Sequence, residues 1–260
     1  MNDSSYGTNP LAEVAPPPRP APIVKENLVS PAVTYALVVI TVLVYLLQMG
    51  TKALFGTDLP EYFGVKVNEL IMAGQLWRLL TPMFLHDDTS ILHIGFNMYA
   101  LFIIGADLER RFGHGRYLLL YVLTGFSGNV LSFLLSPNPS LGASTAIFGL
   151  LGAQMGFFYQ NRKLYGAGAR RALQNSLVVA GINLLIGLAP GIDDWGHVGG
   201  LLGGLVFAWF AGPLLVVHQD LYPNFHVEDT RGARDILIAA AFVALIFGGL
   251  VAAKISGLAF

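Results

Sequence analysis

The sequence predicts an all-α protein that crosses a membrane several times. Hydrophobic residues make up 54% of the 260 positions and charged residues only 12%, whereas a soluble domain carries about 25% charge. The mean hydropathy is +0.61. The charges are clustered, so long uncharged stretches of transmembrane length remain between them. These three observations indicate a polytopic helical membrane protein.

Seven apolar stretches are expected to form the membrane helices, each bounded by charges, prolines or polar loops. A long segment separates the first stretch from the second. Its apolar part, Leu76 to Leu85, is too short to cross and contains Arg78 and Pro82, which favours a re-entrant or interfacial loop. The predicted spans are residues 32–49, 91–106, 117–136, 144–160, 172–189, 195–217 and 235–256.

The chain is expected to divide into four segments. Residues 1–30 are polar and proline-rich and lack the basic and apolar regions of a signal peptide, which predicts a disordered cytoplasmic tail. Residues 31–218 would form a six-helix core, residues 219–234 a cytoplasmic loop, and residues 235–260 a seventh transmembrane helix.

The distribution of basic residues predicts the orientation. With a cytoplasmic N-terminus, eleven of the 15 lysines and arginines fall on the inner side, as the positive-inside rule requires. The chain is therefore expected in the cell membrane with its N-terminus inside. The four basic residues on the outer side are Lys52, Lys66, Arg78 and Lys254.

Composition also limits the possible functions. The net charge of −1 and the lack of a basic stripe argue against a nucleic-acid partner. The absence of cysteine excludes disulfides, zinc–thiolate sites and a cysteine nucleophile. His86 and His93 could be metal ligands, but there is no HExxH motif and no carboxylate within the spans near His93, so we expect neither a metal nor another cofactor.

Four polar side chains are expected at one membrane depth. In the predicted orientation the second, fourth and sixth spans all begin at the outer face. Their first turns contain His93 and Asn97, Ser144, and His197 respectively. Polar groups within a membrane are costly unless they are paired. The shared depth therefore suggests that these side chains face one another just below the outer surface.

Ser144 has two possible roles. It can be a helix N-cap or a small packing residue, which is common at such positions. Alternatively it is a nucleophile, because the free N–H groups of a helix N-terminus favour a developing oxyanion. Gly142 and Ala143 would then allow a substrate carbonyl to approach closely.

A nucleophilic serine needs a base, and His197 is the candidate. Gly196, Gly200 and Gly204 recur at every fourth residue beside it. The fourth span carries Gly152 and Gly156 at the same spacing, so the two helices can approach closely enough for a hydroxyl–imidazole hydrogen bond. The alternative is that His197 bonds only a backbone carbonyl or marks the end of a loop.

Three further residues complete the candidate site. Phe148 follows Ser144 by four positions on the same helix face, where its ring can pack on the imidazole or simply face lipid or the core. His93 and Asn97 also share a face and can both donate hydrogen bonds to an oxyanion. Asp193 and Asp194 are interpreted as solvated loop carboxylates, so the expected unit is a Ser–His dyad.

With these residues placed, the chain resembles the rhomboid family of intramembrane serine proteases from about Pro31 to Val217. HIGFN, GAST and GHVGG occur in the order of the family's HxxxN, GxS and GHxxG motifs, and Trp77–Arg78 matches its WR pair. The segment GADLERRFGHGR is also similar, with Glu109 and Arg111 in structural positions. The seventh span resembles the six-plus-one arrangement found in part of the family.

The resemblance implies a role for each matching position. Ser144 would be the nucleophile and His197 the base, while His93, Asn97 and the Ser144 N–H would form the oxyanion hole. Phe148 matches the aromatic position that packs on the histidine. The fifth span would gate lateral entry of transmembrane protein substrates from the lipid bilayer. Thr145 departs from the glycine that often follows the serine, which puts catalytic efficiency in doubt.

Two other functions compete with a protease. An inactive rhomboid-like protein would bind membrane clients without cutting them, but Ser144 and His197 are both present. A transporter would also have intramembrane histidines and glycine-interrupted helices, but no internal repeat is visible. The sequence predicts neither the natural substrate nor the oligomeric state.

Overall fold

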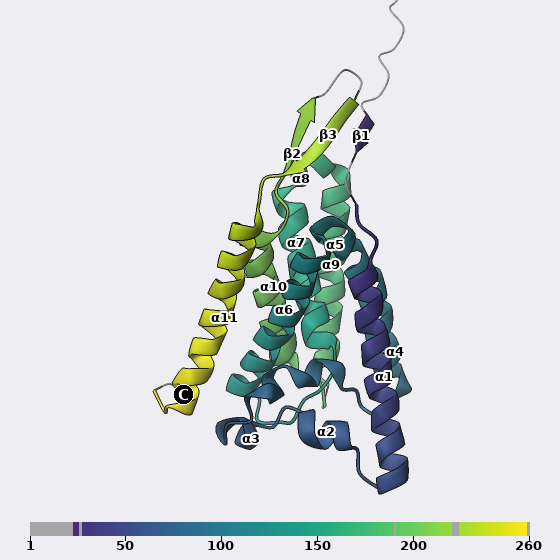
Figure 1. Cartoon of the computed structure of the whole chain (residues 1–260), viewed down its shortest axis with the longest axis vertical. Coiled ribbons are helices and arrows are strands. Elements are labelled where there is room, and N and C mark those ends of the chain that lie inside the picture. Colours follow the sequence, from purple (N-terminus) through teal and green to yellow (C-terminus); the bar gives the residue numbers. More distant parts are fainter. Residues whose placement is uncertain (1–22, 26–27, 190, 220–223, 259–260) are drawn as a thin grey trace, which may run out of the picture.

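In the computed structural model, the described residues are 23–25, 28–189, 191–219 and 224–258. They form a bundle of long helices with a layer of short helices at one end and a small sheet at the other (Figure 1). The long helices are α1 (Ala32–Phe55), α4 (Ile91–Ala100), which continues through the π-helical η3 (Leu101–Gly105) into α5 (Ala106–Phe112), α6 (His114–Leu135), α7 (Ser144–Gln160), α9 (Ala167–Gly187), α10 (Asp194–Ala211) and α11 (Ala233–Ile255). The predicted helical membrane fold is confirmed.

Four of the described helices are long and apolar enough to cross a membrane by length and composition alone: α1, α4–α5, α6 and α11. The other three predicted spans correspond to α7, α9 and α10. Helix α7 has 17 residues, most of them buried against neighbouring helices. A helix in the centre of a bundle contacts protein more than lipid, so its apolar character can be interrupted by glycine and polar residues.

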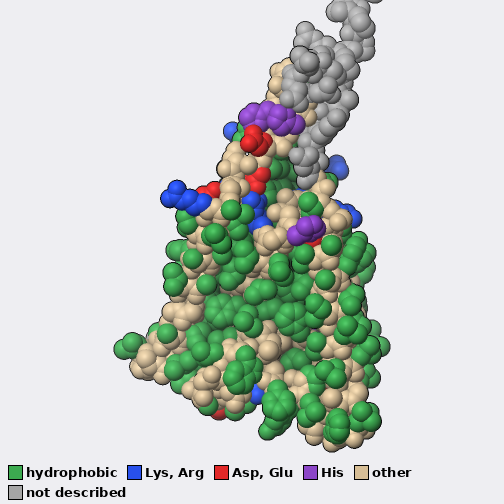
Figure 2. Space-filling view, in the orientation of Figure 1, with side chains coloured by type: hydrophobic (Ala, Val, Ile, Leu, Met, Phe, Trp, Pro, Cys, Tyr) green, Lys and Arg blue, Asp and Glu red, His purple; other side chains and the backbone are tan. Residues whose placement is uncertain are grey.

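Apolar side chains cover the middle of the bundle, and most of the charged side chains visible in this view gather near the end that bears the sheet (Figure 2). Large exposed apolar residues occur along α1, α4, α9 and α11, as lipid-facing helices require. The chain is therefore an integral membrane protein whose outer helices present an apolar belt.

The sixth predicted span is wrong at its C-terminal end. Helix α10 ends at Ala211 because Gly212 is extended and Pro213 cannot continue the helix. The chain then forms β2 (Leu215–Gln219), which pairs antiparallel with β3 (Asn224–Asp229) inside the predicted loop. Strand β1 (Ile23–Lys25), within the predicted disordered tail, pairs parallel with β3. The rest of that tail, residues 1–22 and 26–27, lies outside the described residues.

Helices α6, α7 and α10 form the centre of the bundle (Figure 1). Glycine allows their backbones to touch. A Cβ added to Gly204 would lie 2.6 Å from the carbonyl carbon of Gly149, and one added to Gly152 would lie 3.0 Å from that of Leu201. The small-residue faces predicted on the fourth and sixth spans therefore meet, and they hold α7 against α10 at backbone distance.

The segment between α1 and α4 is folded through α2 (Leu59–Gly64), α3 (Asn68–Met72) and the 3₁₀ turns η1 (Leu76–Leu79) and η2 (Thr81–Phe84). Buried Arg78 holds it together by donating to the backbone carbonyls of Tyr62 and Val65, at 2.8 and 2.7 Å. The Gly142 N–H donates to the Pro82 carbonyl at 2.9 Å. We call residues 56–90 the first loop; it lies against the residues that precede α7.

Glu109 stabilises the start of α1. Its carboxylate accepts hydrogen bonds from the backbone N–H groups of Val33 and Thr34, at 2.8 and 2.6 Å, and one from the Thr34 hydroxyl. The first N–H groups of a helix have no partner within the helix, and a negative charge there also opposes the helix dipole. The short helix α8 (Arg162–Tyr165) connects α7 to α9 at the sheet end of the bundle (Figure 1).

Candidate active site

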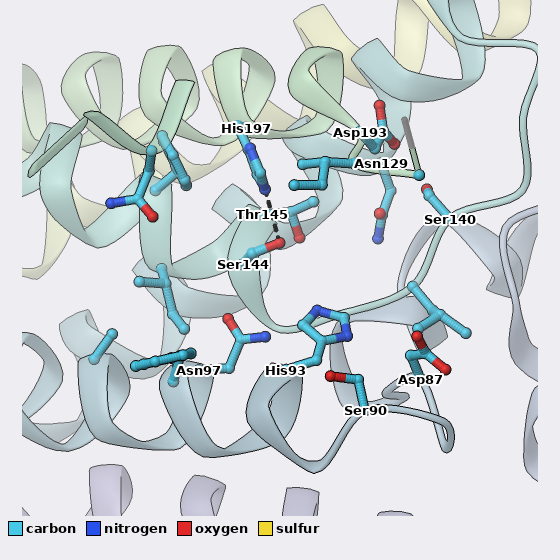
Figure 3. Close-up of a pocket in the computed structure, with 18 of the residues that line it drawn as sticks. Asp87, Ser90, His93, Asn97, Asn129, Ser140, Ser144, Thr145, Asp193 and His197 are labelled. Atoms are coloured by element: carbon cyan, nitrogen blue, oxygen red, sulfur yellow. Dashed lines mark hydrogen bonds between the residues drawn. The ribbon is translucent and has the colours of Figure 1, made fainter. Parts of the chain in front are cut away.

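Ser144 is the first residue of α7, and its hydroxyl does not cap the helix. The N-cap position belongs to Ala143, and no side chain caps this end. Instead, the Ser144 Oγ lies 2.9 Å from Nε2 of His197, which comes from the first turn of α10 (Figure 3). Of the two roles open to Ser144 from the sequence, the geometry therefore favours the one in which it is paired with a base.

His197 is held by an aromatic ring. The residue is 7% exposed, and the ring of Phe148 stacks on the imidazole with a centroid distance of 4.2 Å and an interplanar angle of 6°. Parallel stacking at this distance restricts rotation of the imidazole about its χ2 bond. The structure thus places Phe148 against His197, where the sequence left open whether it faced lipid or the site.

The close contact of α7 with α10 brings the two side chains together. A Cβ added to Gly200 would lie 3.0 Å from the carbonyl carbon of Thr145, one residue after Ser144. The Thr145 methyl fits between Gly196 of α10 and Gly128 of α6, because neither glycine has a side chain to displace it. The β-branched residue that departs from the family pattern is accommodated without separating the helices.

His93 and Asn97 project from α4 toward Ser144 from the side opposite His197 (Figure 3). Because Gly142 has no side chain, a space remains between His93 and Ser144. A Cβ at this position would lie 3.0 Å from His93 Nε2 and 3.6 Å from Ser144 Oγ. The backbone of Gly142 has a φ of +132°, which L side chains rarely adopt. Four side chains predicted from different helices to share one depth are therefore brought to one place.

These residues line a cavity of about 690 Å³. Its walls include Ser144, His197, His93 and Asn97 together with apolar side chains such as Phe96, Ile104 and Leu151. A cavity of this size that combines apolar walls with a few convergent polar groups is typical of a binding or catalytic site. It is large enough to hold several residues of an extended peptide.

Asp193 does not behave as the solvated loop carboxylate that the sequence suggested. It is the N-cap of α10: one oxygen accepts the N–H of Gly196 at 3.1 Å, and the other accepts a short hydrogen bond from the Ser132 hydroxyl of α6. Aspartate is one of the residues preferred at a helix N-cap, where its side chain accepts a backbone N–H of the first turn. The sequence prediction missed this cap because it interpreted both aspartates as solvated loop carboxylates.

Asp194 lies nearer to the base. Its Oδ1 is 3.5 Å from Nδ1 of His197, and neither atom has a hydrogen-bond partner among the described residues. The two atoms are therefore close but do not form a hydrogen bond. The geometry therefore leaves the serine and histidine as the directly bonded pair, with a carboxylate close by.

His86, considered from the sequence only as a weak metal ligand, is fully buried in the first loop. Its ring centroid lies 5.1 Å from that of His93. Among the residues that the structure describes, no group of three or more histidines, aspartates and glutamates is placed to hold a metal ion. Burial lowers the pKa of His86 to about 3, and the neighbouring His93 contributes to that lowering, whereas the nearby Phe84 carbonyl opposes it.

Comparison with known proteins identifies the family to which the chain belongs. Residues 73–214 match the model of the Rhomboid domain. The chain is 42% identical to "Rhomboid protease GluP" of Bacillus subtilis (strain 168) over 85% of its length, and 37% identical to "RHOMBOID-like protein 9, chloroplastic" and "RHOMBOID-like protein 6, mitochondrial" of Arabidopsis thaliana, over 61% and 64%. The matches cover 41%, 36% and 52% of those proteins. The domain match covers more than half of the chain, which therefore belongs to the rhomboid family.

Proposed function

We propose that this protein is an intramembrane serine endopeptidase that cleaves transmembrane segments of other membrane proteins. The observation that carries the proposal is the 2.9 Å contact between Ser144 Oγ and His197 Nε2 inside a cavity at one end of the helix bundle. A nucleophile within hydrogen-bond distance of a base that is itself held in place is the arrangement that covalent catalysis requires. The similarity to a protein named a protease adds support.

In the proposed mechanism, a neutral His197 accepts the Ser144 proton through Nε2 as Oγ attacks the scissile carbonyl. The resulting imidazolium then donates this proton to the leaving amine, and an acyl-enzyme forms on Ser144. A water molecule, deprotonated by His197, hydrolyses the ester and regenerates both side chains. Stacking of Phe148 keeps Nε2 directed at the serine throughout.

The negative charge of the tetrahedral intermediate would be stabilised by His93, Asn97 and the Ser144 N–H. His93 Nε2 and Ser144 Oγ border the same space beside Gly142. The Ser144 N–H lies at the first turn of α7, where the helix dipole also favours an anion. Loss of one such donor typically lowers kcat by about 10²–10³.

The substrate class follows from the location of the site. Hydrolysis needs water, and a helical substrate hides its carbonyls in hydrogen bonds, so the substrate helix must unwind near the cleavage point. Glycine or proline there should favour cleavage because both weaken helices. We place α9 as the side on which substrates enter, since its residues Val179 and Asn183 line the cavity and its outer face exposes large apolar residues such as Leu185.

We also propose that the N-terminus is cytoplasmic, that the membrane is the cell membrane, and that the site opens outward. Most basic residues belong to the end of the bundle that carries the sheet, and the cavity lies at the opposite end near the first loop. The positive-inside rule assigns the basic end to the cytoplasm. Cysteine-accessibility labelling of the Cys-free chain, with single cysteines at Asn138 and Lys163, would test this orientation.

A fluorophosphonate probe tests the function itself, because it reacts only with an activated serine. Wild-type protein should be labelled and should cleave a model transmembrane substrate, whereas Ser144→Ala and His197→Ala should do neither while melting like the wild type. Labelling of Ser144→Ala, or cleavage by it above a trace, would show that the assignment is wrong. Wild-type protein that neither labels nor cleaves but binds the substrate would favour an inactive relative that holds membrane clients.

A further inference from the structure

His86 makes contacts that connect α1 to the residues before the serine. Its backbone N–H donates to Gln48 Oε1 at 3.0 Å, and its carbonyl accepts from Gln48 Nε2 at 3.1 Å. The same Nε2 also donates to Asp58 Oδ2 at 2.8 Å, and Gln48 is completely buried. The backbone of residue 86 is thus fixed on both sides by one side chain of α1.

The imidazole of His86 reaches from there to the proposed oxyanion hole. Its Nε2 accepts a long hydrogen bond, 3.4 Å, from the backbone N–H of Ala143. Ala143 directly precedes Ser144, so this bond orients the peptide unit next to the one that carries the Ser144 N–H. The ring also packs against His93 at 5.1 Å with an angle of 59° between the two planes. One side chain therefore contacts both the serine loop and a proposed oxyanion donor.

Only a neutral imidazole can accept a hydrogen bond. The pKa of His86 is lowered to about 3, chiefly by burial, so the ring is uncharged at any pH at which the protein would work. Because Nε2 is the acceptor, the ring proton must be on Nδ1. Charge therefore plays no part in its contact with Ala143, which depends on one lone pair in one position.

We propose that His86 is a positioning residue for the reaction, which sets the geometry of the oxyanion hole by accepting the Ala143 N–H and packing against His93. This inference rests on the proposed function. It assigns no chemical step to His86, since the ring touches neither Ser144 Oγ nor His197 in the described contacts. It predicts that the acceptor atom at the Nε2 position matters more than the ring itself.

Three substitutions at His86 separate the acceptor from the packing. His86→Phe keeps the ring and removes the acceptor. In His86→Gln the amide oxygen can occupy the place of Nε2, whereas in His86→Asn the shorter side chain places it near Nδ1. We expect kcat to fall by about 10- to 100-fold in the Phe and Asn variants, as a misplaced catalytic group typically causes. We expect KM to change by less than about twofold, and His86→Gln to remain within about threefold of wild-type kcat.

Asn68→Ala is the matched control. Asn68 is another first-loop residue; it is partly buried, and its side chain donates to the backbone carbonyl of Ser136 at 2.9 Å. It does not contact residues 141–144 in the described bonds, so its removal should leave kcat unchanged even if it lowers Tm. Equal losses in the Gln and Asn variants, or losses that follow Tm across all four variants, would show that His86 has only a structural role.

Hydrogen exchange of the peptide that contains residues 141–144 gives a readout that does not need catalysis. Exchange should be faster in His86→Phe and His86→Asn than in wild type, and close to wild type in His86→Gln and Asn68→Ala. If the wild-type protein proved inactive toward probe and substrate, the proposed function would fail, and this measurement would still decide whether His86 holds the serine loop. Unchanged exchange in all His86 variants would overturn the proposal.

Discussion

Replacing Gly200 by alanine should damage stability and turnover together. The added Cβ would lie 3.0 Å from the Thr145 carbonyl carbon and closer still to its oxygen, whereas ordinary van der Waals contact begins at 3.4 Å. Backbone cannot rotate away as a side chain can, so α10 must move from α7. Alanine gains about 1 kcal/mol of helix propensity over glycine, but overpacking typically costs about 1–3 kcal/mol. We therefore expect a net destabilisation of up to about 2 kcal/mol.

The same movement affects the catalytic pair. Ser144 Oγ and His197 Nε2 are 2.9 Å apart, and a hydrogen bond weakens beyond about 3.2 Å. A shift that relieves the overlap with Thr145 would carry the pair past that limit. A displacement of about 1 Å at a reacting centre can cost 10²-fold in rate, so we expect kcat to fall by about one to two orders of magnitude.

The assay compares Tm and kcat of Gly200→Ala with those of Gly248→Ala in one detergent. Gly248 lies in α11, and an added Cβ would have no atom within 4 Å, so this control should be neutral or slightly more stable than wild type. Wild-type Tm and wild-type kcat in Gly200→Ala would refute the inference that backbone contact between α7 and α10 sets the site. A lower Tm with unchanged kcat would refute the inference that this contact positions Ser144 and His197 for catalysis.

Phe148→Ala should lower kcat more than the double change Asp193→Asn and Asp194→Asn, measured on one solubilised substrate. The double change should lower kcat by less than about tenfold, because asparagine caps a helix as well as aspartate does. If the double change instead lowered kcat by about 10⁴ and Phe148→Ala stayed near wild type, the site would be a triad. Gly142→Ala should reduce both kcat and fluorophosphonate labelling, because the added methyl would lie 3.0 Å from His93 Nε2. Labelling at the wild-type level would contradict an oxyanion hole beside Gly142. The depressed pKa of His86, about 3 in the fold against 6.5 ordinarily, means that the unfolded chain takes up this proton first as pH falls. The free energy of unfolding should therefore decline from pH 6.5 toward pH 3, by about 2 kcal/mol at pH 5. If thermal melts of His86→Gln showed the same decline, His86 would be excluded as its cause.

The placement of the polar residues could be predicted because it needs only topology and helix periodicity. Spans that begin at one face bring their first turns to one depth, and a residue four positions after Ser144 must share its side of α7. The glycine spacing on the sixth span likewise predicts a smooth face. Each of these predictions concerns residues that are close in sequence or ordered by the membrane.

The features that were missed depend on long-range contacts or on short elements. His86 meets Gln48 and Ala143, which are 38 and 57 positions away, and nothing near residue 86 in the sequence indicates either partner. The sheet consists of strands of three, five and six residues, too short for a clear alternation of apolar and polar side chains. The cap formed by Asp193 was readable locally, but its bond to Ser132 of α6 was not.

The residues of the candidate site are held in place in two different ways. Ser144 and His197 depend on a backbone contact between two central helices, where any added atom must displace main chain. The proposed oxyanion donors His93 and Asn97 depend instead on α4, which exposes Ile91 and Phe96, and the peptide before the third donor, the Ser144 N–H, is bonded by the first loop. Changes along the α7–α10 contact should therefore lower Tm and kcat together, whereas changes in the first loop that reach Ala143 should lower kcat with a smaller effect on Tm. The two halves of one active site would then be separable by whether stability follows activity.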